Sequence, residues 1–329
     1  MTNASSLRNP VRAVRIEARA KLNLGLAVGP RRADGYHELA TVFQSVSLAD
    51  TLVVAPKSRG FSLTIRYEDA SLGRRSATRS ARRGRRLRKG PGRVPAGRAN
   101  LVLRAARLLS ARHDLPGGAA FSLIKRIPAG AGLGGGSADA AAALVGLARL
   151  HGLRWPLPDR LAIGEELGSD VPFALLGGTA LGLGRGERLR RLRLATPIRA
   201  VLAVPSWRVE TARAFRALDR RKYGLTGWTR HLRFVEALGR KAVRPRDALR
   251  LGNAFERVLG EQRSGFLSLC ARLRHAGAEV PHLTGSGSAV FGILPARLTA
   301  PRFADRFAGD EAIYLIRSRG TGLTHHTLR

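Results

Sequence analysis

The sequence predicts an α+β protein of two domains, and its length and two kinds of periodicity support this prediction. The chain has 329 residues, more than the roughly 100–200 residues of a typical single domain. Some segments alternate polar and apolar residues, as strands do, and others repeat apolar residues at helical spacing. We place the domain boundary near Leu181, which gives an N-terminal domain of residues 1–181 and a C-terminal domain of residues 182–329.

Strand and helix signals are interspersed along both domains. The predicted strands are 15–28, 52–55, 61–67, 119–124 and 198–204. The predicted helices are 100–112, 137–150, 159–167, 209–218, 230–238, 253–259 and 264–276. Asn100 stands where an N-cap belongs at the start of the first of these helices. Residues 72–97 are rich in Arg, Gly, Ser and Pro, and we expect them to form a mobile surface loop.

The composition restricts the class of protein. The formal net charge of +35 raises the alternative of a basic nucleic-acid-binding protein. Most basic residues are Arg and they are spread over the whole chain, which a general preference for Arg explains equally well. The single cysteine, Cys270, cannot form an internal disulfide, and we expect a cytoplasmic protein without a membrane span. The sequence is compatible with a monomer or a homodimer.

The segment Pro128–Leu144 has the composition of a phosphate-binding loop. Five glycines occupy the seven positions 130–136, and Ser137 then opens an Ala-rich helix. Glycines let backbone N–H groups converge on a phosphate, and the positive end of the helix dipole favours the same anion. The loop lacks the Gly-Lys-Ser/Thr triplet of a Walker loop and the G-x-G-x-x-G pattern of a dinucleotide site. A flexible connector followed by a small-residue packing helix is the alternative.

Three separated segments together resemble the three motifs of the GHMP kinases, the family of galactokinase, homoserine kinase and mevalonate kinase. They are ARAKLNLGLAVGPRRADGYHEL at Ala18–Leu39, the glycine loop, and LTGSGSAVF at Leu283–Phe291. The resemblance implies the two-domain α+β fold of this family, with the active site in the cleft between the domains. Residues 285–288 would support the glycine loop across that cleft, and a plain turn between strands is the alternative.

Two further segments are similar to one group within the family. RRADGYHEL follows AKLNL, and GSDVPF lies at Gly168–Phe173. This similarity implies an ATP-dependent kinase that phosphorylates the 2-hydroxyl of a cytidine-diphosphate-linked methylerythritol in the non-mevalonate isoprenoid pathway, with Mg²⁺ as a further cofactor. A GHMP kinase of the homoserine or mevalonate type is the closest alternative. The histidines show no zinc-binding spacing, and no residue is assigned to a metal.

The resemblance assigns two catalytic residues. Asp170 in GSDVPF matches the family's catalytic aspartate, whose carboxylate would accept the proton of the acceptor hydroxyl. Lys21 in AKLNL matches the lysine that would hold this carboxylate ionised and offset the developing charge. From the residues alone, a helix-terminal aspartate and a solvated surface lysine are the alternatives. Lysine is scarce in this chain, however, and Lys21 stands between two apolar residues.

The resemblance also assigns the substrate and nucleotide contacts. Tyr36 and His37 would recognise the cytosine, Phe215 would close its other side with Thr211 nearby, and Asn23 would hold the sugar alcohol. Packing in a turn or in the core is the alternative for Tyr36 and Phe215. The expected nucleotide-binding residues are Asn100, Lys125, Pro128, Ala129, Gly130, Ala131, Gly132, Leu133, Gly134, Gly135, Gly136, Ser137 and Ala138.

Overall fold

A seven-stranded sheet forms one half of the molecule. The computed structural model describes residues 13–72, 94–220, 225–240 and 242–328. The sheet has the strand order β11-β1-β2-β4-β3, with β5 paired to β2 and β6 to β5. Its strands are β1 (Ala13–Arg31), β2 (His37–Lys57), β3 (Gly60–Tyr67), β4 (Gly118–Lys125), β5 (Thr179–Gly184), β6 (Arg188–Leu192) and β11 (Leu323–Leu328). All pairs are antiparallel except β3 with β4.

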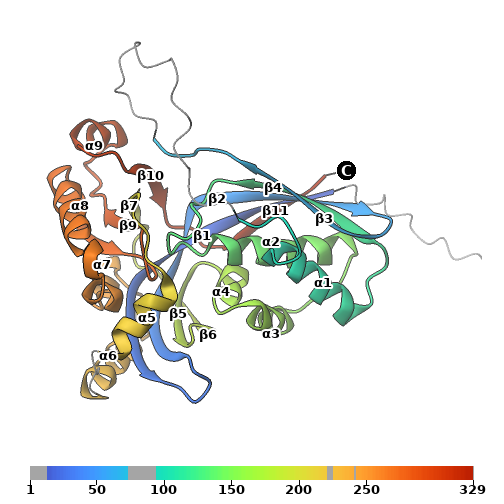
Figure 1. Cartoon of the computed structure of the whole chain (residues 1–329), viewed down its shortest axis with the longest axis horizontal. Coiled ribbons are helices and arrows are strands. Elements are labelled where there is room, and N and C mark those ends of the chain that lie inside the picture. Colours follow the sequence, from blue (N-terminus) through green and yellow to red (C-terminus); the bar gives the residue numbers. More distant parts are fainter. Residues whose placement is uncertain (1–12, 73–93, 221–224, 241, 329) are drawn as a thin grey trace, which may run out of the picture.

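Four helices cover one face of this sheet (Figure 1). They are α1 (Leu101–His113), α2 (Gly135–Leu150), α3 (Leu157–Leu167) and α4 (Val171–Leu176). The small side chains of α2 allow close contact with the strands, because a Cβ on Gly146 would lie 2.6 Å from Val54 Cγ2. The core of this half is therefore built around an almost fully buried, Ala-rich helix. That helix is also the one that follows the glycine loop.

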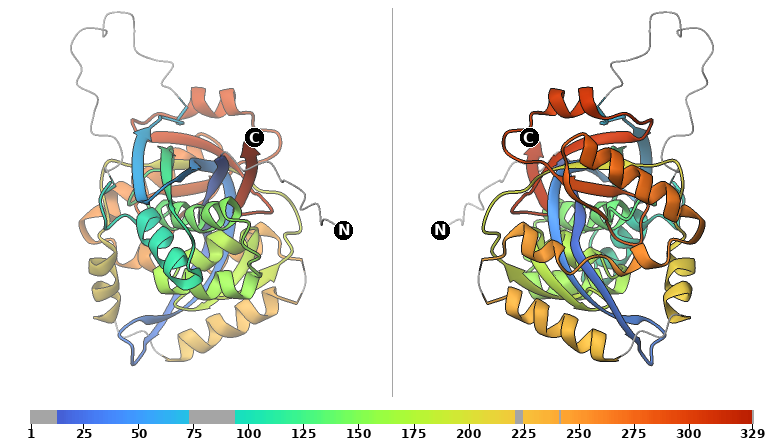
Figure 2. Two further views of the ribbon diagram at one scale, coloured as in Figure 1. Left: turned by 90° about the vertical axis from the view of Figure 1, so that its right-hand side faces the viewer. Right: turned by 90° about the vertical axis from the view of Figure 1, so that its left-hand side faces the viewer.

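A four-stranded sheet with the order β10-β7-β9-β8 forms the other half. Its strands are β7 (Arg199–Val204), β8 (Glu279–Leu283), β9 (Val290–Ile293) and β10 (Ala312–Arg317). The helices of this half are α5 (Thr211–Asp219), α6 (Leu225–Leu238), α7 (Pro245–Leu249), η2 (Ala254–Arg257), η3 (Gly260–Gln262), α8 (Arg263–His275) and α9 (Ala300–Arg306). Phe266, Leu269 and Leu273 of α8 are buried in its core. The two sheets and their helices lie side by side in Figure 1, and Figure 2 shows them one behind the other.

The long hairpin of β1 and β2 extends from the first half along the second. Its register shifts between Arg19 and Lys21 and again between Asn23 and Gly25. The hairpin packs against α6, where a Cβ on Gly29 would lie 2.6 Å from the Trp228 ring. This hairpin therefore carries residues of the first motif from the sheet to the cleft between the two halves.

Several predicted elements are confirmed, and the structure corrects others. The predicted strands and the N-cap Asn100, whose side chain accepts from Val102 N at 2.8 Å, are found. Ser137 is not a cap: α2 begins at Gly135, and its N-cap is Gly134 in the left-handed region. Where an α-helix was expected over 253–259, only Ala254–Arg257 is helical, as the short 3-10 helix η2. Most of the expected surface loop, residues 73–93, lies outside the described residues.

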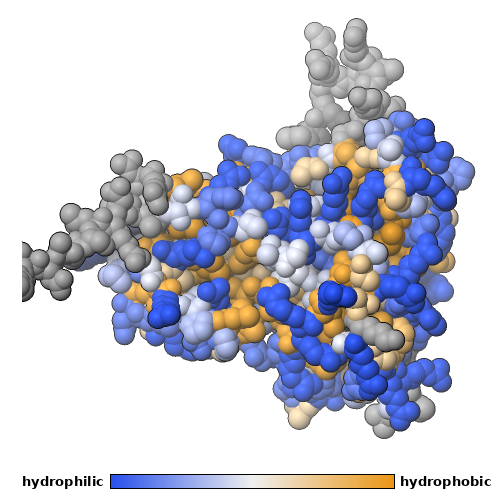
Figure 3. Space-filling model, turned by 180° about the vertical axis from the view of Figure 1, so that it is seen from behind, coloured by the Kyte–Doolittle hydropathy of each residue, from blue (hydrophilic) through white to orange (hydrophobic). Residues whose placement is uncertain are grey.

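The two halves of the structure do not divide at the expected boundary near Leu181. Leu181 lies within β5, so the first sheet continues beyond it into β6. Near the C-terminus the chain returns, and β11 pairs with β1 along Ala13–Ala18. On the face in Figure 3, hydrophilic residues cover much of the surface between scattered hydrophobic ones. Among the described helices, none has the length and apolarity that a membrane span requires.

Candidate active site

A cavity of about 440 Å³ lies where the two halves meet. Its wall includes residues of the β1–β2 hairpin, the glycine loop, the turn before α4, the β5–β6 turn, α5 and the turn between β8 and β9. The residues assigned from the sequence that line it are Lys21, Asn23, Tyr36, His37, Gly130, Gly132, Gly134, Ser137, Asp170, Thr211 and Phe215. Segments more than 250 residues apart in the sequence thus form one wall, as the assignment of a single site requires.

Lys21 and Asp170 meet in this cavity. Lys21 Nζ lies 3.5 Å from Asp170 Oδ2, although 148 positions separate them in the sequence. Asp170 directly precedes α4, but its side chain makes no capping hydrogen bond there and is 34% exposed. The carboxylate is therefore available to a molecule in the cavity. The backbone N–H of Lys21 donates to Leu133 O at 3.0 Å, which attaches the strand to the glycine loop.

Asn23 connects the lysine to the third motif. Its Oδ1 accepts from Lys21 Nζ at 2.7 Å and from Gly285 N at 3.0 Å, and its Nδ2 donates to Thr41 Oγ1 at 2.8 Å. The backbone N–H of Asn23 donates to Thr284 Oγ1 at 3.0 Å. Asn23 is buried and its amide is fully engaged, so it orients the lysine as well as lining the cavity. The sequence analysis assigned neither Thr41 nor Thr284.

The glycine loop has a backbone conformation that residues with side chains rarely adopt. Gly130, Gly132 and Gly134 have φ values of +70°, +81° and +68°. A Cβ on Gly132 would lie 2.3 Å from Thr284 O, and a Cβ on Gly285 would lie 2.8 Å from Gly132 O. Ala289 N also donates to Ala131 O at 3.2 Å. The expectation that the third motif supports the glycine loop is confirmed.

Lys125 lies beneath the loop in a buried cluster and does not line the cavity. Its Nζ donates to Asp139 Oδ2 at 2.7 Å and also to Asp50. Burial raises the pKa of Asp139, although the positive charge of Lys125 acts in the opposite direction. The other oxygen of this carboxylate, Oδ1, has no hydrogen-bond partner. Burial opposes the charge on Lys125, but Asp139 and Asp50 together raise the pKa of this lysine. Asn100 also stays outside the cavity wall, where its side chain caps α1.

The residues expected to recognise the base lie at one end of the cavity. Tyr36 is 54% exposed, and the His37 ring stacks on Phe215 with the centroids 5.3 Å apart. His37 Nδ1 lies 3.1 Å from Gly29 O, and Nε2 lies 3.0 Å from Asp219 Oδ1. Both neighbours, a backbone carbonyl and a carboxylate, are hydrogen-bond acceptors, and they hold the ring from its two nitrogens. The hairpin is thereby joined to the last residue of α5 across the cleft.

Thr211 completes this end of the wall from the first residue of α5. Its hydroxyl lies 2.8 Å from Ser286 Oγ, so the helix start contacts the third motif. Phe215, one turn later, packs edge-on against Phe255 at 5.0 Å. Phe215 therefore rests on aromatic neighbours on both sides, His37 and Phe255, within the cavity wall.

Comparison with known proteins identifies the family. A model of the N-terminal domain of GHMP kinases matches residues 100–178. A 4-diphosphocytidyl-2-C-methyl-D-erythritol kinase from Pelotomaculum thermopropionicum is 39% identical over 302 residues, which cover 92% of this chain and 96% of that protein. The chain belongs to the 4-diphosphocytidyl-2-C-methyl-D-erythritol kinase family of GHMP kinases. A relative of the same name from Moorella thermoacetica is 40% identical over 296 residues, 88% of this chain and 93% of that protein.

Solved structures agree with membership of this GHMP kinase family. A crystal structure of 4-(cytidine 5'-diphospho)-2C-methyl-D-erythritol kinase is 34% identical with a TM-score of 0.69, covering 93% of this chain and 99% of that chain. Homoserine kinase from Cytophaga hutchinsonii has a TM-score of 0.68 at 17% identity, covering 99% and 100% of the two chains. The second likeness concerns the fold alone, and it extends over both halves of the molecule.

Three residues around the site of this GHMP kinase were not anticipated. Arg185 lines the cavity from the β5–β6 turn, Asp219 pairs with His37, and Asp139 pairs with Lys125. Asp139 carried a signal, because a lone carboxylate in an Ala-rich helix must find a partner when it is buried. Arg185 and Asp219 carried none, since both stand among many charged residues. Within the described residues, no three His, Cys, Asp or Glu side chains gather as a metal site.

Proposed function

We propose that the chain transfers the γ-phosphoryl group of ATP to the 2-hydroxyl of 4-diphosphocytidyl-2-C-methyl-D-erythritol. The observation that carries this proposal is the 3.5 Å approach of Lys21 to Asp170, beside the glycine loop and in one cavity with Tyr36 and His37. The relatives that cover most of the chain are named for this activity. A location in the reducing cytoplasm fits the single, buried Cys270.

Asp170 acts as the general base in this proposal. Its carboxylate is partly exposed to the cavity, and no capping bond holds it to α4. A carboxylate within hydrogen-bond reach of the acceptor hydroxyl orients that group and accepts its proton as the oxygen attacks phosphorus. The proton transfer and the alignment of the hydroxyl therefore depend on the same side chain.

Lys21 acts through its charge and its fixed position. The ammonium faces Asp170 on one side, and Asn23 Oδ1 holds it at 2.7 Å on another. A positive charge placed before the reaction stabilises the negative charge that develops on the transferred group, without reorganisation.

The glycine loop fits the phosphates of a nucleotide. At the left-handed glycines of the loop and at the N-terminus of α2, no Cβ obstructs the approach of an anion to the backbone N–H groups. ATP supplies the transferable phosphoryl group, and Mg²⁺ bound to its phosphates would neutralise their charge. Among the assigned cavity residues, Asp170 is the carboxylate that could contact such an ion.

Tyr36, His37 and Phe215 recognise the cytidine end of the acceptor in this proposal. An exposed tyrosine ring provides a stacking surface for a base, and the His37 and Phe215 rings form a second apolar surface nearby. Thr211 and Asn23 line the same cavity. A homoserine or mevalonate kinase would not need these aromatic residues, so the base end separates the proposed activity from those of other GHMP kinases.

A direct assay tests the proposal. The purified chain is incubated with ATP, Mg²⁺ and the cytidine-linked methylerythritol, and phosphorus NMR follows the appearance of a new phosphate monoester with loss of the γ-phosphate. Parallel reactions contain homoserine or mevalonate as acceptor. We expect product with the cytidine-linked acceptor alone. Phosphorylation of homoserine or mevalonate at a comparable rate would overturn the assignment of the substrate.

A further inference from the structure

The turn between β5 and β6 places a cation against the exposed ring at the base end. The guanidinium carbon of Arg185 lies 5.1 Å from the centroid of the Tyr36 ring, within the range of a cation–π interaction. Both side chains line the cavity. Tyr36 nevertheless keeps 54% of its surface exposed, so Arg185 covers part of the ring and leaves the rest open.

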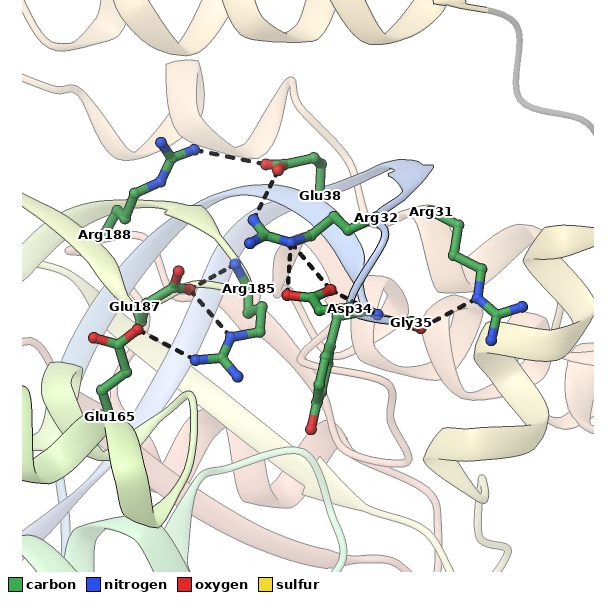
Figure 4. A network of polar contacts seen from close by, with 10 residues as sticks. Arg31, Arg32, Asp34, Gly35, Glu38, Glu165, Arg185, Glu187 and Arg188 are labelled. Atoms are coloured by element: carbon green, nitrogen blue, oxygen red, sulfur yellow. Dashed lines mark hydrogen bonds and ion pairs between the residues drawn. The ribbon is translucent and has the colours of Figure 1, made fainter.

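Two glutamates fix the position of Arg185. Its Nη2 donates to Glu165 Oε1 of α3 at 3.2 Å, and its Nε lies 4.0 Å from Glu187 Oε2 (Figure 4). Glu187 also accepts from the backbone N–H of Arg185 at 2.6 Å. A Cβ on Gly184 would lie 2.6 Å from Glu187 Oε1, so this glycine makes room for the carboxylate. The turn is thus built to hold the arginine side chain in one place.

The turn that carries Tyr36 is fixed separately. Asp34 Oδ1 accepts from the backbone N–H of Tyr36 at 3.1 Å, and Arg32 connects Asp34 to Glu38 through contacts of 3.1 and 2.8 Å. Figure 4 shows Arg32, Asp34 and Glu38 beside the Arg185 cluster. The pairing of Leu39 with Gly184 brings the two turns together. The backbone of Tyr36 is therefore held by its own turn, while its ring is contacted by the neighbouring one.

We propose that Arg185 is a positioning residue for base recognition, which orients the Tyr36 ring to stack on the pyrimidine of the acceptor. This inference rests on the proposed function. Two carboxylates already face the guanidinium and offset its charge, which favours a role in holding the ring over direct binding of the acceptor's diphosphate. The ion pairs restrict the motion of the Arg185 side chain, and Arg185 in turn restricts the motion of the Tyr36 ring. Tyr36 is more than half exposed.

Steady-state kinetics of Arg185→Ala test this inference. Restricting the ring contributes to acceptor binding before and during the reaction, so we expect KM for the cytidine-linked acceptor to rise about three- to tenfold. The kcat and the KM for ATP should stay within about twofold of the unchanged chain. Arg185→Lys should recover part of the loss, because an ammonium also binds a ring face. Arg190→Ala is the matched control, since this exposed arginine lies on β6 of the same hairpin.

A double-mutant cycle with Tyr36→Leu separates positioning from direct binding. If Arg185 acts through the ring, Arg185→Ala raises KM no further in the Tyr36→Leu background. An equal rise in both backgrounds, or an unchanged KM in the single variant, would overturn the inference and leave the proposed function intact. A chain that forms no phosphate monoester from the cytidine-linked acceptor would instead overturn the proposed function, and this inference with it. Melting temperatures of all variants verify that each is folded.

Discussion

Two lysine–carboxylate clusters flank the same glycine loop, and they differ in their access to the cavity. A Cβ on Gly134 would lie 3.0 Å from Lys21 Cγ, whereas a Cβ on the next residue, Gly135, would lie 3.3 Å from Lys125 Nζ. The Lys125 side chain is 2% exposed and bonds two buried carboxylates. Lys21 faces Asp170, whose side chain is 34% exposed. We call Lys125 with Asp50 and Asp139 the closed cluster, and Lys21 with Asp170 the open cluster. The two clusters lie beside adjacent glycines of the loop.

This difference in access to the cavity indicates which of the two clusters can take part in the reaction. Carboxylates that are buried and paired cannot reach a substrate, but they stabilise the elements that they join, here β2, the end of β4 and the first turns of α2. A carboxylate that faces a cavity can exchange its partner for a substrate hydroxyl. We therefore expect changes in the open cluster to reduce turnover and changes in the closed cluster to reduce stability.

Asp170→Asn should produce the largest effect. The amide keeps the shape of the side chain but cannot accept the hydroxyl proton, so we expect kcat to fall by about three orders of magnitude. The urea midpoint and ATP binding should be unchanged, because Asp170 makes no capping bond. Asp305→Asn on the exposed surface of α9 is the matched control. Wild-type turnover in Asp170→Asn would refute the assignment of the base.

Lys125→Met should cause the largest loss of stability among the cluster variants. Removing the ammonium leaves Asp50 and Asp139 buried without their cation, which lowers the free energy of unfolding by about 3–5 kcal/mol. Urea denaturation measures the loss, and Lys57→Met, at an exposed lysine of β2, provides the control. A stable Lys125→Met variant with weakened ATP binding would instead support a direct contact of Lys125 with the nucleotide.

The sequence was sufficient for the open cluster but not for the closed one. Motif resemblance brought Lys21 and Asp170 together because each stands in a segment with a distinctive pattern. The same reasoning placed Lys125 near the nucleotide, and in sequence it is indeed next to the glycine loop. Its partner Asp50 lies 75 residues earlier in an ordinary strand, and only the pairing of β2 with β4 brings them into contact. Contacts of that kind depend on sheet register, which local patterns do not reveal.

The fold shows the same limit at β5, β6 and β11. β5 (TALGLG) is glycine-containing and β6 (RLRRL) is Arg-rich, and neither has a strong strand propensity, so the sequence analysis assigned no strands there. Pairing with the long strand β2 stabilises β5, and pairing with β1 stabilises β11. Long-range pairing therefore overrides weak local preference, and it also places Arg185 beside Tyr36.

Lys21→Met should have a smaller effect on turnover than Asp170→Asn and a smaller effect on stability than Lys125→Met. Loss of one fixed charge at the reacting centre should reduce kcat by about two orders of magnitude. The free energy of unfolding should fall by about 1 kcal/mol, because Asn23 Oδ1 still accepts from Gly285 N. Steady-state assays measure kcat and urea denaturation measures the free energy of unfolding, with Lys57→Met again as the control. Equal losses of stability in Lys21→Met and Lys125→Met would remove the distinction between the clusters.

Asp139→Asn should have the smallest effect on turnover, and its effect on stability should depend on pH. Burial raises the pKa of Asp139, so the folded chain keeps this proton at pH values where the unfolded chain has released it. Stability then falls as pH rises above the unfolded value near 3.9, by at most about 1.4 kcal/mol per pH unit, until the folded pKa is reached. Asn does not titrate, so the variant should gain stability relative to the unchanged chain over this range.

Urea curves of the two chains at successive pH values from about 4 to 8 measure this difference. The Asn amide has nearly the same shape as the protonated carboxyl, so the comparison isolates the proton. If Lys125 instead kept Asp139 ionised against the effect of burial, the slope of stability against pH would have the opposite sign. The unchanged chain would then become more stable relative to the variant as pH rises. That result would mean that Asp139 carries its charge beneath the phosphate-binding loop, where a negative charge opposes the binding of the nucleotide's phosphates.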